Sequence, residues 1–150
     1  MKRNLLFLCV LILVSTTKIF AQVNLTATAG TLNASYTNLK SAFDNINNGV
    51  HQGTISISII GNITETATAN LNGSTGTANY TSVNITTTGA STISGNIASA
   101  IIKLSGADNV TIDGNNQLTI SNTNASTSAT LIWVASTSWG DPAKNNVIRN

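Results

Sequence analysis

Short runs in which hydrophobic and polar residues alternate fill the chain from residue 53 onward. The clearest of them, residues 54–59, reads Thr-Ile-Ser-Ile-Ser-Ile, and this period of two is typical of a β-strand with one face in a core. Gly, Asn, Asp and Ser separate the later runs, with no helical pattern between them. Those runs are residues 83–85, 92–94, 102–104, 110–112, 118–120, 132–134 and 147–149. The pattern predicts an all-β structure of short strands.

The spacing of aliphatic residues predicts how these strands are arranged. Three families recur with a common period of about 27–30 residues. Their members are Ile57, Ile85 and Ile112 in the first, Ile93, Ile120 and Ile148 in the second, and Ile102 with Ile132 and Leu104 with Val134 in the third. A chain that coils around a triangular core would produce this pattern. We therefore expect a three-faced parallel solenoid, and an antiparallel sandwich ranks second because it needs no shared period.

One helix is predicted, over residues 37–47. Its apolar residues Leu39, Ala42, Phe43 and Ile46 form a single stripe. Thr37 is the expected N-cap, and Asn48 or Gly49 the expected end. Residues 22–35 read as an irregular lead-in with one strand. The lead-in and the capping helix together are expected to span residues 22–52, and the incomplete coils residues 53–150.

The solenoid pattern also predicts an open C-terminal end. The helix is expected to cover the first coil, because a bare solenoid end exposes both core and strand edges. No comparable covering segment is visible near Ile148. We therefore expect further coils of the same chain to follow beyond residue 150.

Residues 1–21 have the layout of a secretory signal peptide. Lys2 and Arg3 precede an apolar run at residues 5–14, and Ala21 is the expected cleavage point. The apolar run is too short to cross a bilayer as a helix, so no transmembrane span is expected after cleavage. The sequence thus predicts export to the outside of the cell or to its surface.

Removal of this leader changes the electrostatics of the chain. The full sequence has a formal net charge of +2, but residues 22–150 contain four basic and five acidic residues. This balance gives no support to a nucleic-acid partner. The only cysteine, Cys9, lies in the leader, which excludes thiolate sites from the rest. The chain also holds 60 Ser, Thr and Asn residues and only 8% charged ones.

Four segments carry a resemblance to a known family. Residues 38–47, 61–66, 106–114 and 118–122 resemble the amino-terminal part of large secreted Gram-negative surface proteins. Such proteins are similar to the pectin-lyase-like family of right-handed parallel β-helices. The resemblance implies that fold with an N-terminal capping helix, and it implies little about activity, since the fold hosts lyases, hydrolases, esterases, adhesins and stalks.

No coherent catalytic set is visible. Asp108, Asp113 and Asp141 would suit a calcium-dependent lyase, but Asp113 precedes Gly114 and Asp141 precedes a proline, as turn-forming residues do. His51, the only histidine, lies between glycines and is expected in a solvated loop. We therefore expect no catalytic residue, no metal ligand and no cofactor in this segment, and calcium has no specific support.

Trp133 is the strongest candidate for binding. If Ile132 and Val134 face inward, Trp133 faces outward in line with Lys103, and an exposed indole can stack on a sugar. The interpretation that we prefer from the sequence is that Trp133 packs beneath the loop that contains Trp139, Asp141 and Pro142. We expect a secreted or cell-surface scaffold or adhesin, with extracellular polysaccharide or surface proteins as partners. The rival is a polysaccharide lyase or glycoside hydrolase whose active site lies beyond residue 150.

The leader hypothesis predicts a defined mature N-terminus. When the full chain is expressed in a Gram-negative host, we expect export and cleavage after Ala21, so that the purified protein begins at Gln22. Intact-mass measurement and N-terminal sequencing check this. A protein that retains Met1 and stays in the cytoplasm would contradict it.

Overall fold

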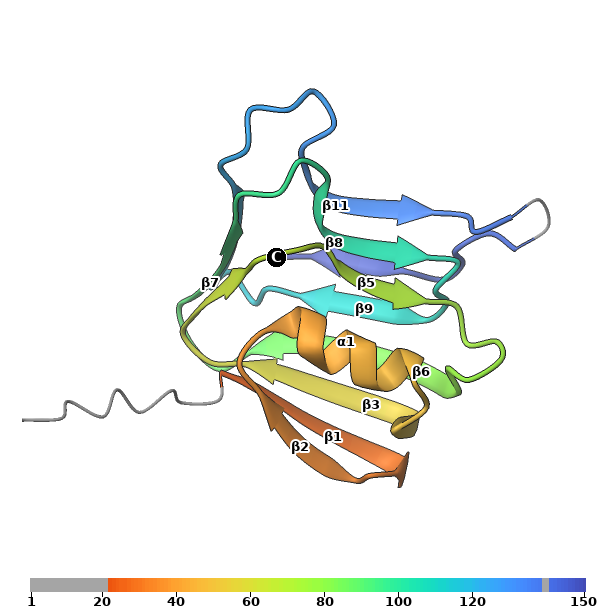
Figure 1. The fold of residues 1–150 in the computed structure, drawn as a ribbon. Helices are drawn as coiled ribbons and strands as arrows, with labels where there is room; N and C mark the ends of the chain where they lie inside the picture. Colours follow the sequence, from red (N-terminus) through yellow and green to blue (C-terminus); the bar gives the residue numbers. More distant parts are fainter. Residues whose placement is uncertain (1–21, 139–140) are drawn as a thin grey trace, which may run out of the picture.

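The computed structural model describes residues 22–138 and 141–150, which form one helix and twelve strands (Figure 1). The helix is α1 (Leu39–Asn47), which is too short to cross a membrane, and the described residues contain no other helix. The strands are β1 (Val23–Gly30), β2 (Asn33–Tyr36), β3 (His51–Ile59), β4 (Asn62–Glu65), β5 (Ala69–Asn72), β6 (Tyr80–Thr87), β7 (Ser91–Gly95), β8 (Ala100–Ser105), β9 (Val110–Asp113), β10 (Leu118–Asn122), β11 (Thr130–Ala135) and β12 (Val147–Arg149).

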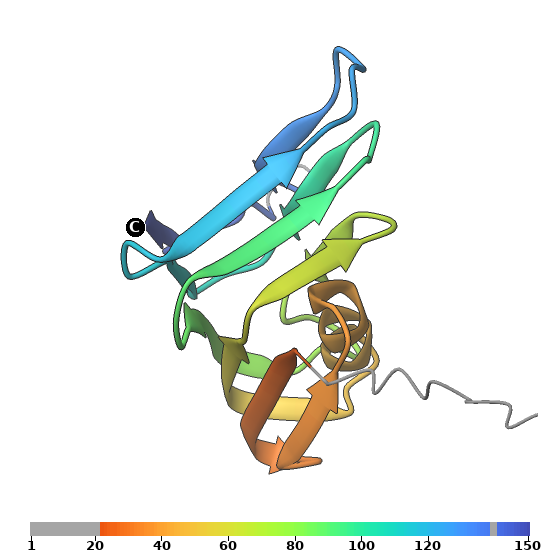
Figure 2. The ribbon, with the colours of Figure 1, turned by 90° about the vertical axis from the view of Figure 1, so that its left-hand side faces the viewer.

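The strands form three separate sheets (Figure 2). Sheet A has six strands in the order β12-β9-β6-β3-β1-β2, sheet B has the order β10-β7-β4, and sheet C has the order β11-β8-β5. Sheets B and C are entirely parallel. Sheet A is mixed, because β1 pairs antiparallel with both β2 and β3.

This architecture corrects the predicted fold. The chain does not form a closed right-handed β-helix with a capping helix, because its strands lie in three small sheets of unequal size. The predicted irregular lead-in is also wrong, since residues 22–36 contain two strands that add an antiparallel hairpin to sheet A. The periodicity of a sequence indicates which residues face a core. It does not determine whether neighbouring sheets join around that core.

The predicted pairing of strands is confirmed for most families. Ile57 lies in register with Ile85, and Ile85 with Ile112, across β3, β6 and β9. Ile132 lies in register with Ile102 across β11 and β8. These positions repeat because each strand alternates inward branched residues with outward Ser, Thr or Asn, and a slip by one residue would turn the apolar set outward.

Ile148 is placed differently from the prediction. It pairs with Ile112 in sheet A, 36 residues away, rather than with Ile120 in sheet B. The second family instead begins with Ile63, which pairs with Ile93. The chain passes from sheet C to sheet A here as it does after β5 and β8, but the connection between β11 and β12 is longer than those earlier ones, so Ile148 falls in sheet A. A fixed period cannot anticipate such a change in connection length.

The inward side chains form one continuous core. Its central members are at most 1% exposed, and burial of each contributes about 1.5–3 kcal/mol. Those members include Ile55, Ile57, Ile63, Val83, Ile85, Ile93 and Ile112. Branched residues suit these positions, because their side chains have few rotamers to lose on burial.

The N-cap of helix α1 lies one residue later than the predicted Thr37. The N-cap is Asn38, whose side-chain oxygen accepts a hydrogen bond from the backbone N–H of Ser41 at 2.9 Å. The predicted end is confirmed, since Asn48 is the C-cap and Gly49 has a φ of +72°. The predicted apolar stripe is buried against the core.

Asn47, the last helical residue, joins α1 to the free edge of β5. Its Nδ2 donates to the carbonyl oxygen of Asn70 at 2.8 Å, and its Oδ1 accepts from the N–H of Asn72 at 2.9 Å. One side-chain amide therefore replaces a neighbouring strand along this edge. Figure 1 shows the helix beside β5.

The burial of Ile112 gives a first stability test. Replacement of Ile112 by Asp would place an unpaired carboxylate in the core, and we expect a loss of about 4 kcal/mol or more, enough to unfold a marginal domain.

The matched control is Thr111→Asp, since Thr111 is the next residue along β9 and is partly exposed on the outer face. Urea unfolding followed by circular dichroism compares the two variants. Equal stability of Ile112→Asp and Thr111→Asp would overturn the inward assignment.

Candidate functional site

Sheet C presents one row of three large polar or aromatic residues on its outer face. Asn70, Lys103 and Trp133 lie in register across β5, β8 and β11. The neighbours of Lys103 along its strand, Ile102 and Leu104, are fully buried, whereas the matching residues of the edge strand β11, Ile132 and Val134, are only partly covered. The alternation within the strands therefore forces these three side chains outward. We call Asn70, Lys103 and Trp133 the outer row of sheet C.

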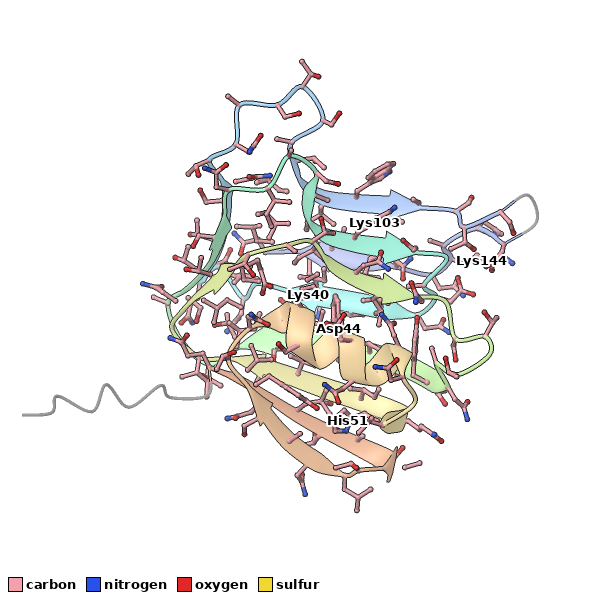
Figure 3. The ribbon with its side chains drawn as sticks, in the orientation of Figure 1. Lys40, Asp44, His51, Lys103 and Lys144 are labelled. Carbon is pink, nitrogen blue, oxygen red and sulfur yellow. The ribbon has the colours of Figure 1, made fainter. Side chains whose placement is uncertain are left out.

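Trp133 is the aromatic residue of the outer row. The residue is 48% exposed, and the Lys103 Nζ lies 4.5 Å from the centroid of its ring. This distance is short enough for a cation–π attraction, which orders the indole beside Lys103. Lys103, labelled in Figure 3, forms no salt bridge with any described residue. Its ammonium group therefore remains free to donate to an added ligand.

A surface depression of about 330 Å³ lies beside Trp133. Ser128, Thr130 and Ile132 line it together with the indole. Thr130 and Ile132 lie on the inward side of β11, in register with the buried Ala100 and Ile102. Trp133 lies on the outward side, so the depression follows the free edge of β11. This combination of an apolar wall and a few polar groups is the usual composition of a small-ligand site.

Asn122 holds the loop that carries Ser128. Its Nδ2 donates to the carbonyl oxygens of Ile97, Ser99 and Thr130 at 2.9–3.2 Å, and its Oδ1 accepts from the N–H of Ile97 at 3.1 Å. These bonds tie the end of β10 to the start of β11. Asn122, Ser128 and Thr130 were not predicted from the sequence, since Asn, Ser and Thr are common everywhere in it.

The alternative environment for Trp133, beneath the loop with Trp139, involves residues 139 and 140, which lie outside the described residues. The predicted outward position of Trp133 agrees with its exposure and its register with Lys103. Whether it binds a ligand stays a prediction.

The three candidate aspartates do not converge. Asp113 accepts from the N–H of Asn115 at 3.0 Å and from two guanidinium nitrogens of Arg149 at 2.7 and 2.9 Å, and the Arg149 bond lowers the pKa of its carboxyl group. Asp108 accepts from the backbone N–H of Lys144, and Asp141 accepts from the hydroxyl of Thr137. Each carboxylate is therefore engaged within the protein: Asp141 bonds its own turn, and Asp108 and Asp113 also hold residues next to or within β12. Within residues 22–138 and 141–150, no three His, Cys, Asp or Glu side chains gather as a metal site would require.

The prediction of a solvated His51 is wrong. His51 is the first residue of β3 and is fully buried. Its Nδ1 lies 2.6 Å from the carbonyl oxygen of Thr31 and its Nε2 lies 2.6 Å from the hydroxyl of Tyr36. Since a carbonyl oxygen only accepts, Nδ1 carries the proton and Tyr36 donates to Nε2. His51 therefore fastens the β1–β2 hairpin onto β3 and is not available to a ligand.

Glu65 is a second buried polar residue with a structural role. It is 1% exposed, and its two carboxylate oxygens accept from the N–H groups of Leu39 and Lys40 at 2.7 and 3.2 Å. Those groups belong to the first turn of α1 and have no partner within the helix. Burial raises the pKa of the Glu65 carboxyl group, and the two backbone hydrogen bonds oppose that rise.

Comparisons with family models, curated proteins and solved structures give no match to this chain. The outer row of sheet C and the depression beside it are therefore the features that indicate a function. Stacking on the indole and hydrogen bonding to Lys103, Ser128 and Thr130 are the two interactions that this surface offers.

The contacts of Glu65 predict a pH-dependent stability difference. Glu65→Ala leaves two N–H groups of α1 without acceptors, so we expect a loss of about 1–3 kcal/mol at pH 7. Because the folded-state pKa is raised, the folded protein binds this proton above the pH at which the unfolded chain does. The contribution of Glu65 to stability therefore increases as pH falls from neutral through the raised pKa.

Urea unfolding of the wild type and Glu65→Ala between pH 7 and pH 5 measures this difference. We expect the gap between them to widen on acidification. Thr64→Ala is the control, since Thr64 is the preceding residue of β4, is exposed and carries no charge, so its difference from the wild type should not change with pH. A gap that narrows on acidification would contradict a raised pKa for Glu65.

Proposed function

We propose that this chain is a secreted or cell-surface binding module that holds carbohydrate on the outer face of sheet C. The observation that carries the proposal is the half-exposed Trp133, which lies beside Lys103 and the depression lined by Ser128 and Thr130. Lys103 forms no salt bridge with any described residue. The predicted signal peptide supports a location outside the cell.

The chemistry of a sugar ring suits this surface. One face of a pyranose presents C–H groups, which pack on the flat π-face of an indole. Trp133 has its ring held by the Lys103 ammonium, so little side-chain entropy is lost when a ligand stacks on it. An indole that is already ordered binds more tightly than a mobile one.

The polar groups around Trp133 fit the rim of a sugar. Ring hydroxyls both donate and accept, and they match the hydroxyl groups of Ser128 and Thr130 and the donors of Lys103. None of the outer-row residues is acidic, so no carboxylate there repels the oxygens of a ligand. Binding without bond cleavage is the activity that these groups support.

The proposal predicts a specific loss of binding in Trp133→Ala. Affinity electrophoresis through gels that contain xylan, dextran, β-glucan or polygalacturonate provides the measurement. We expect at least one of these polysaccharides to retard the wild type. We expect Trp133→Ala to bind it at least about tenfold more weakly. Trp133→Phe should retain part of the affinity, because it keeps an aromatic face.

The matched control is Leu32→Ala. Leu32 is 52% exposed but lies in the β1–β2 turn of sheet A, whereas Trp133 lies in β11 of sheet C. This variant should bind as the wild type does. Equal binding of Trp133→Ala and the wild type, or no binding to any of the polysaccharides, would overturn the proposal.

A further inference from the structure

A second row of outward residues lies beside the outer row of sheet C. Asn72 and Ser105 are in register across β5 and β8, and Ala135 continues this row on β11. Asn70 of the outer row is bonded to both of the polar members. Its Nδ2 donates to the Oδ1 of Asn72 at 2.7 Å, and its Oδ1 accepts from the hydroxyl of Ser105 at 2.6 Å. The Asn70 amide is thus held in one orientation on the outer face of the sheet.

Asn70 keeps hydrogen-bonding capacity for a ligand. A primary amide has two N–H donors and an oxygen with two lone pairs, and the contacts to Asn72 and Ser105 use one donor and one lone pair. Asn70 is partly exposed, so the other N–H and the other lone pair can bond a ligand. Ser105 is only 7% exposed, and its hydroxyl serves to orient the amide. Because the amide is already ordered, little entropy is lost when a ligand bonds it.

The separation of Asn70 from Trp133 matches two linked sugar units. Both residues are in register with Lys103 on the strand between them, and Figure 1 shows the three strands side by side. Neighbouring strands are about 4.8 Å apart, so the two positions are about 10 Å apart across the sheet. Two pyranose rings joined by one glycosidic bond have a comparable length. The outer row can therefore contact two successive units of a polysaccharide, whereas Trp133 alone contacts one.

A ligand that followed β11 instead would meet no comparable partner. Leu131 and Ala135 are the outward residues on either side of Trp133 along β11, and neither side chain has a hydrogen-bonding group. Leu131 is 44% exposed, and Ile101, two residues before Lys103 on β8, is fully buried. The hydroxyl groups of a second sugar would lose contact with water there without gaining a bond, which costs free energy. Hydrogen bonding therefore favours a path across the strands.

We propose that a polysaccharide chain lies across the strands of sheet C, with one sugar unit stacked on Trp133 and the next hydrogen-bonded to Asn70. Lys103, on the strand between them, donates to oxygens of the same ligand. This inference rests on the proposed function, and it adds a second sugar subsite and the direction of the bound chain. A disaccharide is then a better ligand than a single sugar.

The test compares ligands of increasing length on the purified protein. The probes are the monosaccharide, disaccharide and trisaccharide units of whichever of xylan, dextran, β-glucan or polygalacturonate retards the wild type. NMR titration measures each dissociation constant. We expect the disaccharide to bind about tenfold more tightly than the monosaccharide, and the trisaccharide to add little to that gain.

Asn70→Ala removes the second subsite and leaves the first. We expect this variant to bind the disaccharide about five- to tenfold more weakly than the wild type does, and the monosaccharide equally well. Unchanged monosaccharide binding also shows that the variant is folded with Trp133 in place. Ser105→Ala should cause a smaller loss for the disaccharide alone, because it frees the Asn70 amide without removing it.

Leu131→Ser is the matched control, since Leu131 is exposed on the same face two residues from Trp133. This variant should bind both sugars as the wild type does. A loss in Leu131→Ser with none in Asn70→Ala would overturn the path across the strands, and so would equal affinities for the monosaccharide and the disaccharide. Binding that depends on Trp133 but not on Asn70 overturns only this inference. If none of the four polysaccharides binds, the proposed function fails and this inference fails with it.

Discussion

The stacking of branched aliphatic side chains between parallel, in-register strands is the interaction on which the rest of this structure depends. Ile57, Ile85 and Ile112 follow one another across sheet A, and Ile63 and Ile93 do the same across sheet B. No single strand has enough apolar surface to fold alone, since each contributes only two or three inward residues. Stacking adds these small contributions into one core. It also fixes which residues face outward, and the outer row of sheet C is a direct consequence.

Side-chain amides complete the hydrogen bonding where strands end. Asn47 bonds both an N–H and a C=O of the β5 edge. Asn122 bonds both the N–H and the C=O of Ile97, in the connection between β7 and β8. Asn146 accepts from the N–H of Val110 and donates to the carbonyl oxygen of Ala107. An asparagine amide has the donor and acceptor of a peptide group in a side chain. This explains how a chain with so few charged residues satisfies its buried backbone groups.

The surface with functional potential is separate from the buried titratable groups. His51 and Glu65 have hydrogen bonds that connect the hairpin and the helix to the sheets, and neither is accessible. Trp133 is exposed because β11 is both an edge strand and part of an outer face, and Lys103, on the neighbouring β8, is partly buried beside it. The proposed carbohydrate surface therefore uses side chains that the alternation of the strands turns outward, away from the groups that hold the fold together.

The sequence by itself determined the helix, β3 and the strands from β6 to β12, and most of their pairings, because alternation and spacing act locally and through repeated register. The isoleucine spacing was sufficient to pair Ile57 with Ile85, and it was sufficient to turn Trp133 outward beside Lys103. Only the tertiary structure decided that the sheets stay separate, that Ile148 joins Ile112, and that His51 is buried beneath Tyr36. These outcomes depend on connection lengths and on contacts between residues far apart in the chain. Neither leaves a periodic trace in the order of amino acids.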